Sequence, residues 1–263
     1  MSSQDYLFAN VADEAELRFA ALSALFDPGT FRHVDQLGID QGWRCWEVGA
    51  GGASVPNWLA ARAGPNGHVL ATDIDTSRIT RGLDARVEVQ RHDVVLDDPP
   101  DGVFDLVHAR LVLSHLPARD TALQRMASSL RPGGWLLIED FDQVQPFACL
   151  DAYLPEHHRA NKLRDGLHTL LTQRGADLEF ARTLPRRLRA QGLTDVGADA
   201  YFPVASSDAG ALDIANLTQV RAALISKRLA SADDIAAHLA AIRTGHLDVA
   251  TSPLLSAWAR RPT

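Results

Sequence analysis

The sequence predicts an α/β protein built on a doubly wound, mostly parallel sheet. Between about residues 44 and 140, short apolar segments rich in β-branched residues alternate with segments of helical periodicity, which is the pattern of repeated strand-helix-strand units. Turn signals separate these segments, at Asp27-Pro28-Gly29, Gly64-Pro65-Asn66-Gly67, 97–102 and Arg131-Pro132-Gly133-Gly134. Ligands of such sheets bind outside the carboxyl ends of the strands, so the residues after each strand are the candidates for function.

The elements of the first part follow from this alternation. Strands are expected at Arg44 to Val48, His68 to Thr72, Arg86 to Arg91, Val103 to His108 and Trp135 to Glu139. Helices are expected between them, at Val55 to Ala63, Thr76 to Leu83 and Arg119 to Leu130. Before the first strand, Asp13 to Phe26 predicts a helix with Leu17, Ala21 and Leu25 on one side, ended by Asp27-Pro28-Gly29. Such a helix can cover the site as a lid.

The second half is expected to add helical insertions and the last strands. Helical patterns lie near 152–173, 178–190 and 209–241, a strand is expected near Thr194 to Phe202, and His246 to Ala259 predicts a final strand. Leucines at 163, 167, 170 and 171 share a helical spacing, which favours contacts in the core or in a homodimer. With no internal repeat and no clear boundary, a single domain over residues 1–263 is expected.

Composition narrows the class of protein. The chain has 263 residues, 46% hydrophobic and 22% charged, as in ordinary globular proteins. Its formal charge of -7 disfavours nucleic acid as a partner, because that affinity is largely electrostatic. No secretory leader or membrane-length apolar run is seen, and the only cysteines are Cys45 and Cys149. A cytoplasmic protein without disulfides is therefore expected.

The segment from Trp46 to Ser54, WEVGAGGAS, is the strongest signal for a binding site. Glycines where a strand turns into a helix permit a tight turn and close approach of a ligand, and the helix start offers free N–H groups. The dinucleotide fingerprint requires glycine at the position of Ser54. A nicotinamide-dependent oxidoreductase is therefore the alternative interpretation rather than the first.

Acidic residues follow the next two strands. Asp73 closes the second strand, where a carboxylate can accept hydrogen bonds from both hydroxyls of a ribose. Its alternative is a cap or turn residue, although Asp75 is better placed to cap. Asp93 follows the third strand and can accept from an adenine amino group, and a plain turn aspartate is an equally good interpretation in isolation.

Taken in order, these segments resemble the class I S-adenosylmethionine-dependent methyltransferases. The resemblance rests on Glu47, Gly49 and Gly51, then Asp73, Asp93, Phe104-Asp105-Leu106-Val107-His108 and Leu130-Arg131-Pro132-Gly133-Gly134-Trp135. The run from His108 to Pro117 and Glu139-Asp140-Phe141-Asp142 is similar, more narrowly, to actinobacterial natural-product methyltransferases. The family resemblance implies a Rossmann-like sheet of about seven strands with the last antiparallel. It divides the chain into an N-terminal helical lid (1–42), a cosubstrate-binding core (43–140) and substrate-pocket helices with the last strands (141–263).

The resemblance also implies roles for the cosubstrate S-adenosyl-L-methionine. Gly49, Ala50 and Gly51 would hold its methionine part through backbone, and Glu47 would order the glycine turn. Asp73, with Ile74 beside it, would hold the ribose, and Asp93 with the Val94 N–H would read adenine. The His108 carbonyl would hold the amino group. Where the family has a third glycine this chain has Ala53, a mild departure.

Direct in-line transfer requires alignment of a nucleophile with the methyl group and, for a phenol, amine or indole, removal of a proton. His108 and His115 follow the fourth strand and are the candidate bases. For His108 a structural role and catalysis are about equally good interpretations, and in the catalytic one its ring faces the acceptor. For His115 a structural role at the turn before Leu116-Pro117 is the favoured interpretation, and catalysis is the alternative.

Further residues are candidates for contact with the acceptor. Tyr6 and Glu14 would enter the pocket if the amino-terminal segment folds over it, Tyr6 also as a catalytic group. Arg110 is expected to pair with Glu47 or Asp140, or else to meet an acidic substrate. Asp140 and Phe141 end the fifth strand. No metal is expected, because the adjacent His157 and His158 point in different directions on a helix.

The sequence thus predicts methyl transfer to a small, aromatic or heteroaromatic natural product, at oxygen, nitrogen or an electron-rich carbon such as indole C3. Two alternatives stay open: an NAD(P)-dependent oxidoreductase, and a non-catalytic S-adenosylmethionine-binding partner subunit. No membrane or nucleic-acid partner is expected.

Overall fold

One sheet organises the chain. The computed structural model describes Leu7, residues 13–77, Ile79 and residues 82–100, 103–144 and 154–263. In these residues seven strands pair in the order β3-β2-β1-β4-β5-β7-β6. They are β1 (Arg44–Val48), β2 (His68–Asp73), β3 (Val87–Arg91), β4 (Phe104–Arg110), β5 (Leu130–Phe141), β6 (Thr194–Tyr201) and β7 (Leu254–Arg260). The first five are parallel to one another, and β7 runs antiparallel between β5 and β6. The predicted Rossmann-like sheet with an antiparallel last strand is confirmed.

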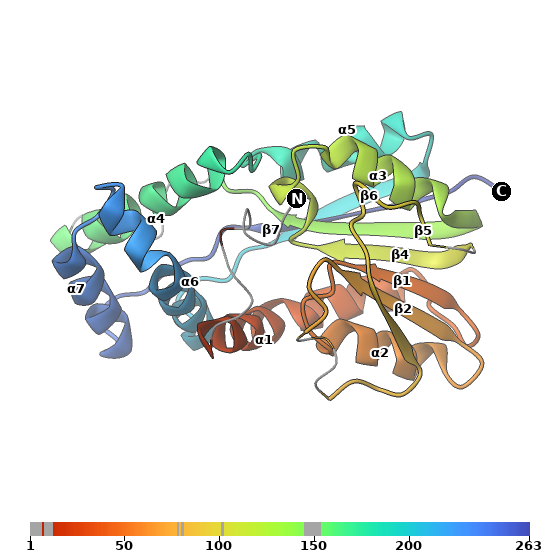
Figure 1. Ribbon diagram of the computed structural model, residues 1–263, viewed down its shortest axis with the longest axis horizontal. Helices are drawn as coiled ribbons and strands as arrows, with labels where there is room; N and C mark the ends of the chain where they lie inside the picture. The colour runs from red at the N-terminus through yellow and green to blue at the C-terminus, as the bar shows by residue number, and fades with distance from the viewer. Residues whose placement is uncertain (1–6, 8–12, 78, 80–81, 101–102, 145–153) are drawn as a thin grey trace.

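Helices cover both faces of the sheet, and two cores result. The helices are α1 (Asp13–Gln36), α2 (Ser54–Ala63), α3 (Arg119–Ser128), α4 (Pro155–Gln173), α5 (Phe180–Ala190), α6 (Ser207–Ser226) and α7 (Ala232–Arg243), with a 3-10 turn, η1, at Leu113–His115. Figure 1 shows α3 and α5 on one face of the sheet and α2 on the other. Trp46 and Val107 pack toward α3 and α5, whereas Cys45 and Leu106 pack toward α2. Strands buried on both sides explain why these segments read as continuous apolar runs.

A third cluster of helices stands beside the sheet. In Figure 1, α4, α6 and α7 group at one end of it, and α1 reaches from this group to the sheet. Leu163, Leu167, Leu170 and Leu171 are buried together with residues of α6 and α7. The leucines of α4 therefore pack in a core that this chain forms by itself with α6 and α7. In the described residues no helix is long and apolar enough to cross a membrane.

Helix α1 is longer than expected. The signal Asp27-Pro28-Gly29 does not end it, and the helix continues to Gln36. Proline inside a helix removes one backbone hydrogen bond, but the turns that follow bury Thr30, His33 and Val34. These contacts outweigh the local signal. Of the three residues expected on one side of this helix, Ala21 and Leu25 are buried, whereas Leu17 is 67% exposed.

Two further expectations, for residues 76–83 and 131–134, are not met. The described residues between Thr76 and Leu83 form turns instead of a helix, because Asn57 of α2 donates to the Gly82 carbonyl and accepts from the Asp84 amide, each at 2.8 Å. Side chains thus satisfy backbone groups that a helix would otherwise pair. The segment 131–134, expected as a turn, belongs to β5, where the register with β4 shifts between Phe104 and Leu106.

Candidate functional site

A cavity of about 360 Å³ opens at the carboxyl ends of the parallel strands. Its walls combine residues that are distant in the sequence: 47–55 from the end of β1 onward, 73–74 from the end of β2, 92–94 after β3, 110–112 and 115–116 from the end of β4, and residues of α1. It lies where the strand order reverses between β1 and β4, the place where ligands bind in doubly wound sheets. The volume is within the range of small-molecule sites, about 300–1,000 Å³.

The glycine turn after β1 forms the floor of this cavity. Gly49 and Gly51 have φ of +66° and +61°, a region that other residues adopt only with strain. A Cβ on Gly51 would lie 2.6 Å from Cε1 of Phe19, and one on Gly49 would collide with Val112. The turn therefore requires glycine at both positions.

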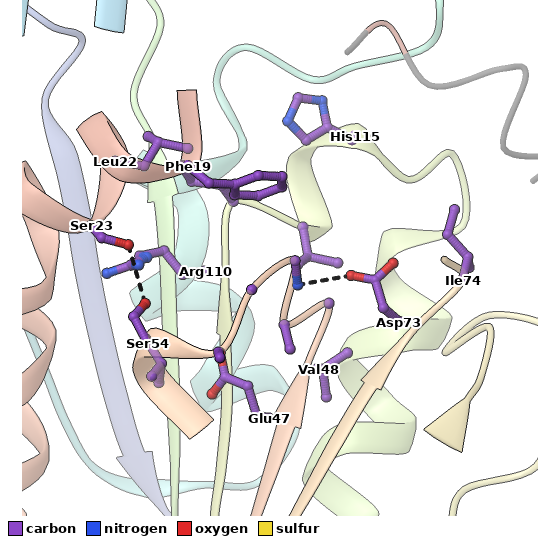
Figure 2. A pocket seen from close by; sticks show the side chains of 18 of the residues that line it. Phe19, Leu22, Ser23, Glu47, Val48, Ser54, Asp73, Ile74, Arg110 and His115 are labelled. Atoms are coloured by element: carbon purple, nitrogen blue, oxygen red, sulfur yellow. Dashed lines mark hydrogen bonds between the residues drawn. The ribbon is translucent and has the colours of Figure 1, made fainter. Parts of the chain in front are cut away.

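The backbone amides of this turn are bound within the protein. The Ala50 N–H donates to the Thr72 carbonyl at 3.0 Å, and the Gly51 N–H donates to the Asp73 carboxylate at 3.0 Å. In Figure 2 a dashed line marks this second bond, which ends on the carboxylate of Asp73. These two N–H groups are therefore already used within the protein. What the glycine turn offers a ligand is a fixed backbone that it can approach closely.

Asp73 connects the ends of β1 and β2. One carboxylate oxygen accepts from Gly51 and the other from the Asp75 amide at 3.0 Å. Burial raises the pKa of Asp73, against the opposing effect of these hydrogen bonds. Each oxygen has a second lone pair, so the carboxylate can still accept from a pair of hydroxyls. Asp73 therefore fixes the turn and offers acceptor sites to the cavity at once.

The third strand contributes Asp93 and Val94, which both line the cavity. One oxygen of Asp93 accepts from the Val95 and Leu96 amides at 2.9 and 3.3 Å. These bonds order the loop after β3, so the turn interpretation of Asp93 is correct. It does not conflict with ligand contact, because Asp93 also lines the cavity.

One wall of the cavity comes from α1 and was not anticipated residue by residue. Phe19, Leu22 and Ser23 line it, and Figure 2 shows the Phe19 ring above the glycine turn. The Ser23 hydroxyl is 3.1 Å from the hydroxyl of Ser54, the first residue of α2. The apolar residues on one side of this helix indicate that this side is buried, but they do not indicate which part of the protein it packs against.

Beneath the cavity a row of polar side chains crosses the sheet. His108 of β4 lies between two glutamates, with Nδ1 2.6 Å from Glu47 and Nε2 3.2 Å from Glu139. Glu139 also contacts Thr30 and His33 of α1, and it accepts from Ser256 of β7 at 2.6 Å. These groups explain how the second half of α1 is fixed to the sheet.

The charges in this row compensate each other. Burial disfavours the charged form of His108, but the charges and hydrogen bonds of Glu47 and Glu139 outweigh burial and raise its pKa to about 9. Burial likewise opposes charge on Glu139, yet bonds to His108 and His33 hold its pKa well below the usual range. A protonated, fully buried ring cannot accept a proton from an acceptor molecule. The prediction that the His108 ring faces the acceptor is therefore wrong.

Two other expectations for charged residues are corrected. Arg110 pairs with neither Glu47 nor Asp140; it donates to Asp27 at 2.7 Å and to Thr30 at 3.0 Å. Asp27 can accept from Arg110 because it lies within α1, which continues past the predicted end at Asp27-Pro28-Gly29. Asp140 is buried, accepts from the Ser114 hydroxyl at 2.7 Å, and its pKa is raised by burial to about 6. It lies outside the cavity lining, so a direct contact with substrate is not supported.

His115 stands where the main cavity meets a smaller second one of about 50 Å³. Burial and the guanidinium groups of Arg18 and Arg119 lower its pKa to about 4, so the ring is neutral at physiological pH. Leu111 also lines both cavities and has φ of +59°. Strained backbone of this kind is concentrated at functional sites.

The remaining expectations divide between described and undescribed residues. Phe141 lines the second cavity and packs edge-on against Phe26, with ring centroids 5.4 Å apart. Tyr6 and the Glu14 side chain lie outside the described residues. In the described part of the chain, no cluster of three or more His, Cys, Asp or Glu side chains is arranged to hold a metal ion.

Known proteins share both sequence and fold with this chain. A family model described as methyltransferase domain matches residues 15–198. Methyltransferase str2 of Strobilurus tenacellus is 32% identical over 198 residues, 72% of this chain and 67% of that protein. Methyltransferase str3 of the same organism is 35% identical over 144 residues, 52% of this chain and 48% of that protein. The chain thus spans about half to two thirds of the length of these relatives.

Solved structures resemble this one at low sequence identity. Phosphoethanolamine N-methyltransferase 2 of Haemonchus contortus, in complex with phosphomonomethylethanolamine and S-adenosylhomocysteine, superposes with a TM-score of 0.60 at 14% identity. The match covers 98% of this chain and 60% of that one. The YcgJ protein of Bacillus subtilis gives 0.53 at 14% identity, with 88% and 97% covered. At such identities the fold alone is shared.

Proposed function

This chain belongs to the family of proteins with a methyltransferase domain, and from that premise we propose that it transfers a methyl group from S-adenosyl-L-methionine to a small-molecule acceptor. The observation that carries the proposal is the meeting of three strand ends in one cavity. The glycine turn after β1, Asp73 after β2 and Asp93 after β3 line it together. An adenosyl group presents a diol and an aromatic amine, which match carboxylates at these places.

The residues fit this cosubstrate. Asp73 accepts from the ribose hydroxyls, Ile74 packs beside it, and Asp93 with Val94 contacts adenine. Gly49, Ala50 and Gly51 line the cavity, where the methionine part can lie against their backbone. Glu47, bonded to His108, holds the amino end.

S-Adenosyl-L-methionine supplies an activated methyl group, so the chain itself has to align the nucleophile and exclude water. His115 is suited to alignment, because a neutral ring beside the boundary of the two cavities can accept a hydrogen bond from the hydroxyl or N–H that is methylated. With a pKa of about 4 it is a weak base. His115 therefore orients the acceptor, and the proton of the methylated hydroxyl, amine or indole passes to solvent at or after methyl transfer.

The acceptor is an aromatic or heteroaromatic natural product, methylated at oxygen, nitrogen or an electron-rich carbon such as indole C3. Phe19, Leu22 and Leu111 line the main cavity and favour a planar apolar body. Tyr6 and Glu14 remain predicted contacts. The narrower likeness to actinobacterial natural-product enzymes, the cytoplasmic location and the homodimer also stay predictions.

Two measurements test the proposal. Calorimetric titration with S-adenosylhomocysteine is expected to show binding, whereas NAD and NADP are expected to show none; the reverse result would favour the oxidoreductase. Incubation with labelled cosubstrate and a panel of phenols, amines and indoles is expected to give a product heavier by one methylene group. Tight cosubstrate binding without turnover on any acceptor would instead favour a non-catalytic partner subunit.

A further inference from the structure

The second cavity is small, and its walls combine apolar side chains with charged and polar ones. It shares Arg18, Leu111 and His115 with the main cavity, and α4, α6 and residues 250–252 close its other sides. One water needs about 10–15 Å³ by the same measure, so a volume of about 50 Å³ accommodates a group of roughly four non-hydrogen atoms.

Arg164 of α4 is one of three charged residues that line this cavity, together with Arg18 and Asp213. Arg164 is 8% exposed, donates to the Ala250 carbonyl at 2.8 Å and lies 3.6 Å from Asp213. The other oxygen of Asp213 is 2.6 Å from Nε2 of His238, so the carboxylate is compensated within the chain. A guanidinium has five N–H donors, and the contacts among the described residues leave donors for a ligand.

Two more polar groups in the wall have no hydrogen-bond partner among the described residues. They are the hydroxyl of Thr251, which is 5% exposed, and Nε2 of His168. Both residues line the second cavity. Buried polar groups without partners are costly and uncommon, so each of these two is expected to bind a water molecule or a polar group of a ligand.

We propose that the second cavity is a subsite for a carboxylate carried by the methyl acceptor, held by Arg164, Thr251 and His168. The inference rests on the proposed methyl transfer and names the substrate class. A guanidinium fork and a hydroxyl donor match the two oxygens of a carboxylate. Burial and Arg164 lower the pKa of His168 to about 4, so its neutral ring can donate through Nε2.

The geometry separates the anchor from the reacting atom. The carboxylate lies beyond Leu111 and His115, whereas the nucleophile lies beside them at the main cavity. The acid is therefore not the group that is methylated. Products should keep a free carboxylate and carry the new methyl group at another position.

The test compares acids with amides of the same size. The protein is first saturated with S-adenosylhomocysteine, which by itself tests the cosubstrate site. Binding of 4-hydroxybenzoate, 4-hydroxyphenylacetate and 4-hydroxycinnamate is then measured by calorimetry against the three primary amides, and their turnover with labelled cosubstrate is followed. At least one acid is expected to bind about tenfold or more tightly than its amide.

Variants assign the preference to this subsite. Arg164→Gln should remove the preference and leave S-adenosylhomocysteine affinity unchanged. Arg159→Gln, on the same helix but paired on the other side with Asp234 at 3.8 Å, is the matched control and should keep it. Should Arg164→Gln fail to fold, Thr251→Val offers a second variant, because it removes a hydroxyl that has no partner among described residues and preserves shape.

The outcomes are distinct. If S-adenosylhomocysteine does not bind, the proposed function fails first. If it binds and every acid binds no better than its amide, including the case in which neither binds, the carboxylate subsite is wrong. A preference that survives both Arg164→Gln and Thr251→Val, or a product that is a methyl ester of the acid, also overturns it.

Discussion

Replacement of His108 by glutamine should destabilise the protein and alter its pH dependence. His108 is fully buried and lies 2.6 Å from Glu47 and 3.2 Å from Glu139. Without the imidazolium, two carboxylates face each other in the interior, and loss of one partner of a buried ion pair costs about 3–5 kcal/mol. We expect His108→Gln to lower the free energy of unfolding by that amount at pH 7.

The pH dependence gives a sharper signature. The pKa of His108 is about 9 in the folded chain against 6.5 for the free side chain. Each pKa unit corresponds to about 1.4 kcal/mol, so this pKa difference contributes about 3 kcal/mol to the free energy of unfolding. Because the folded pKa is raised, the contribution is complete below pH 6.5 and disappears as pH rises through about 9.

Urea unfolding followed by circular dichroism at fixed pH values from 6 to 10 measures both effects. Between pH 6 and 10 the free energy of unfolding of the wild type should fall by about 3 kcal/mol more than that of His108→Gln. His246 is exposed, so His246→Gln is the control and should show the same pH dependence as the wild type. Parallel pH profiles for wild type and His108→Gln would refute the assignment of a protonated, buried imidazolium.

Three further predictions concern the cosubstrate cavity. Asp73→Ala should weaken S-adenosylhomocysteine binding by about ten- to a hundredfold, the worth of hydrogen bonds to a charged group, and an unchanged Kd in calorimetry would contradict this. Gly51→Ala, with φ of +61° and a Cβ 2.6 Å from Phe19, should reduce both Tm and affinity, whereas Gly38→Ala, with φ of +84° and nothing within 4 Å, should reduce Tm alone. His115→Phe should keep S-adenosylhomocysteine affinity and slow turnover by about tenfold or more; full activity in a steady-state assay would exclude its alignment role.

The parts of the fold that sequence reasoning predicted are those determined by local signals. The predicted bounds of β1 agree with the structure, because an apolar run, a pair of glycines and a helix start follow one another directly in the sequence. The structure shows that both glycines have positive φ. The order of Asp73 and Asp93 follows from the parallel alternation, which places successive strand ends at one edge.

The failures share a physical cause, since they depend on partners far away in the chain. His108 has Glu139 as a partner 31 residues away, and His33 contacts the same glutamate across 106 residues. Asp27 reaches Arg110 across 83 residues. Such contacts reverse local expectations: they continue a helix through a proline, and they turn a candidate base into a buried cation.

The position of β7 determines when the sheet can be completed during synthesis. In the described sheet β6 neighbours β7 alone, so residues 194–201 have no strand to pair with until residues 254–260 have left the ribosome. The parallel part can form earlier, but Glu139 then lacks the Ser256 hydroxyl. A nascent chain therefore exposes the edge of β5 for more than a hundred residues of translation, an interval in which unpaired edges invite association with other chains.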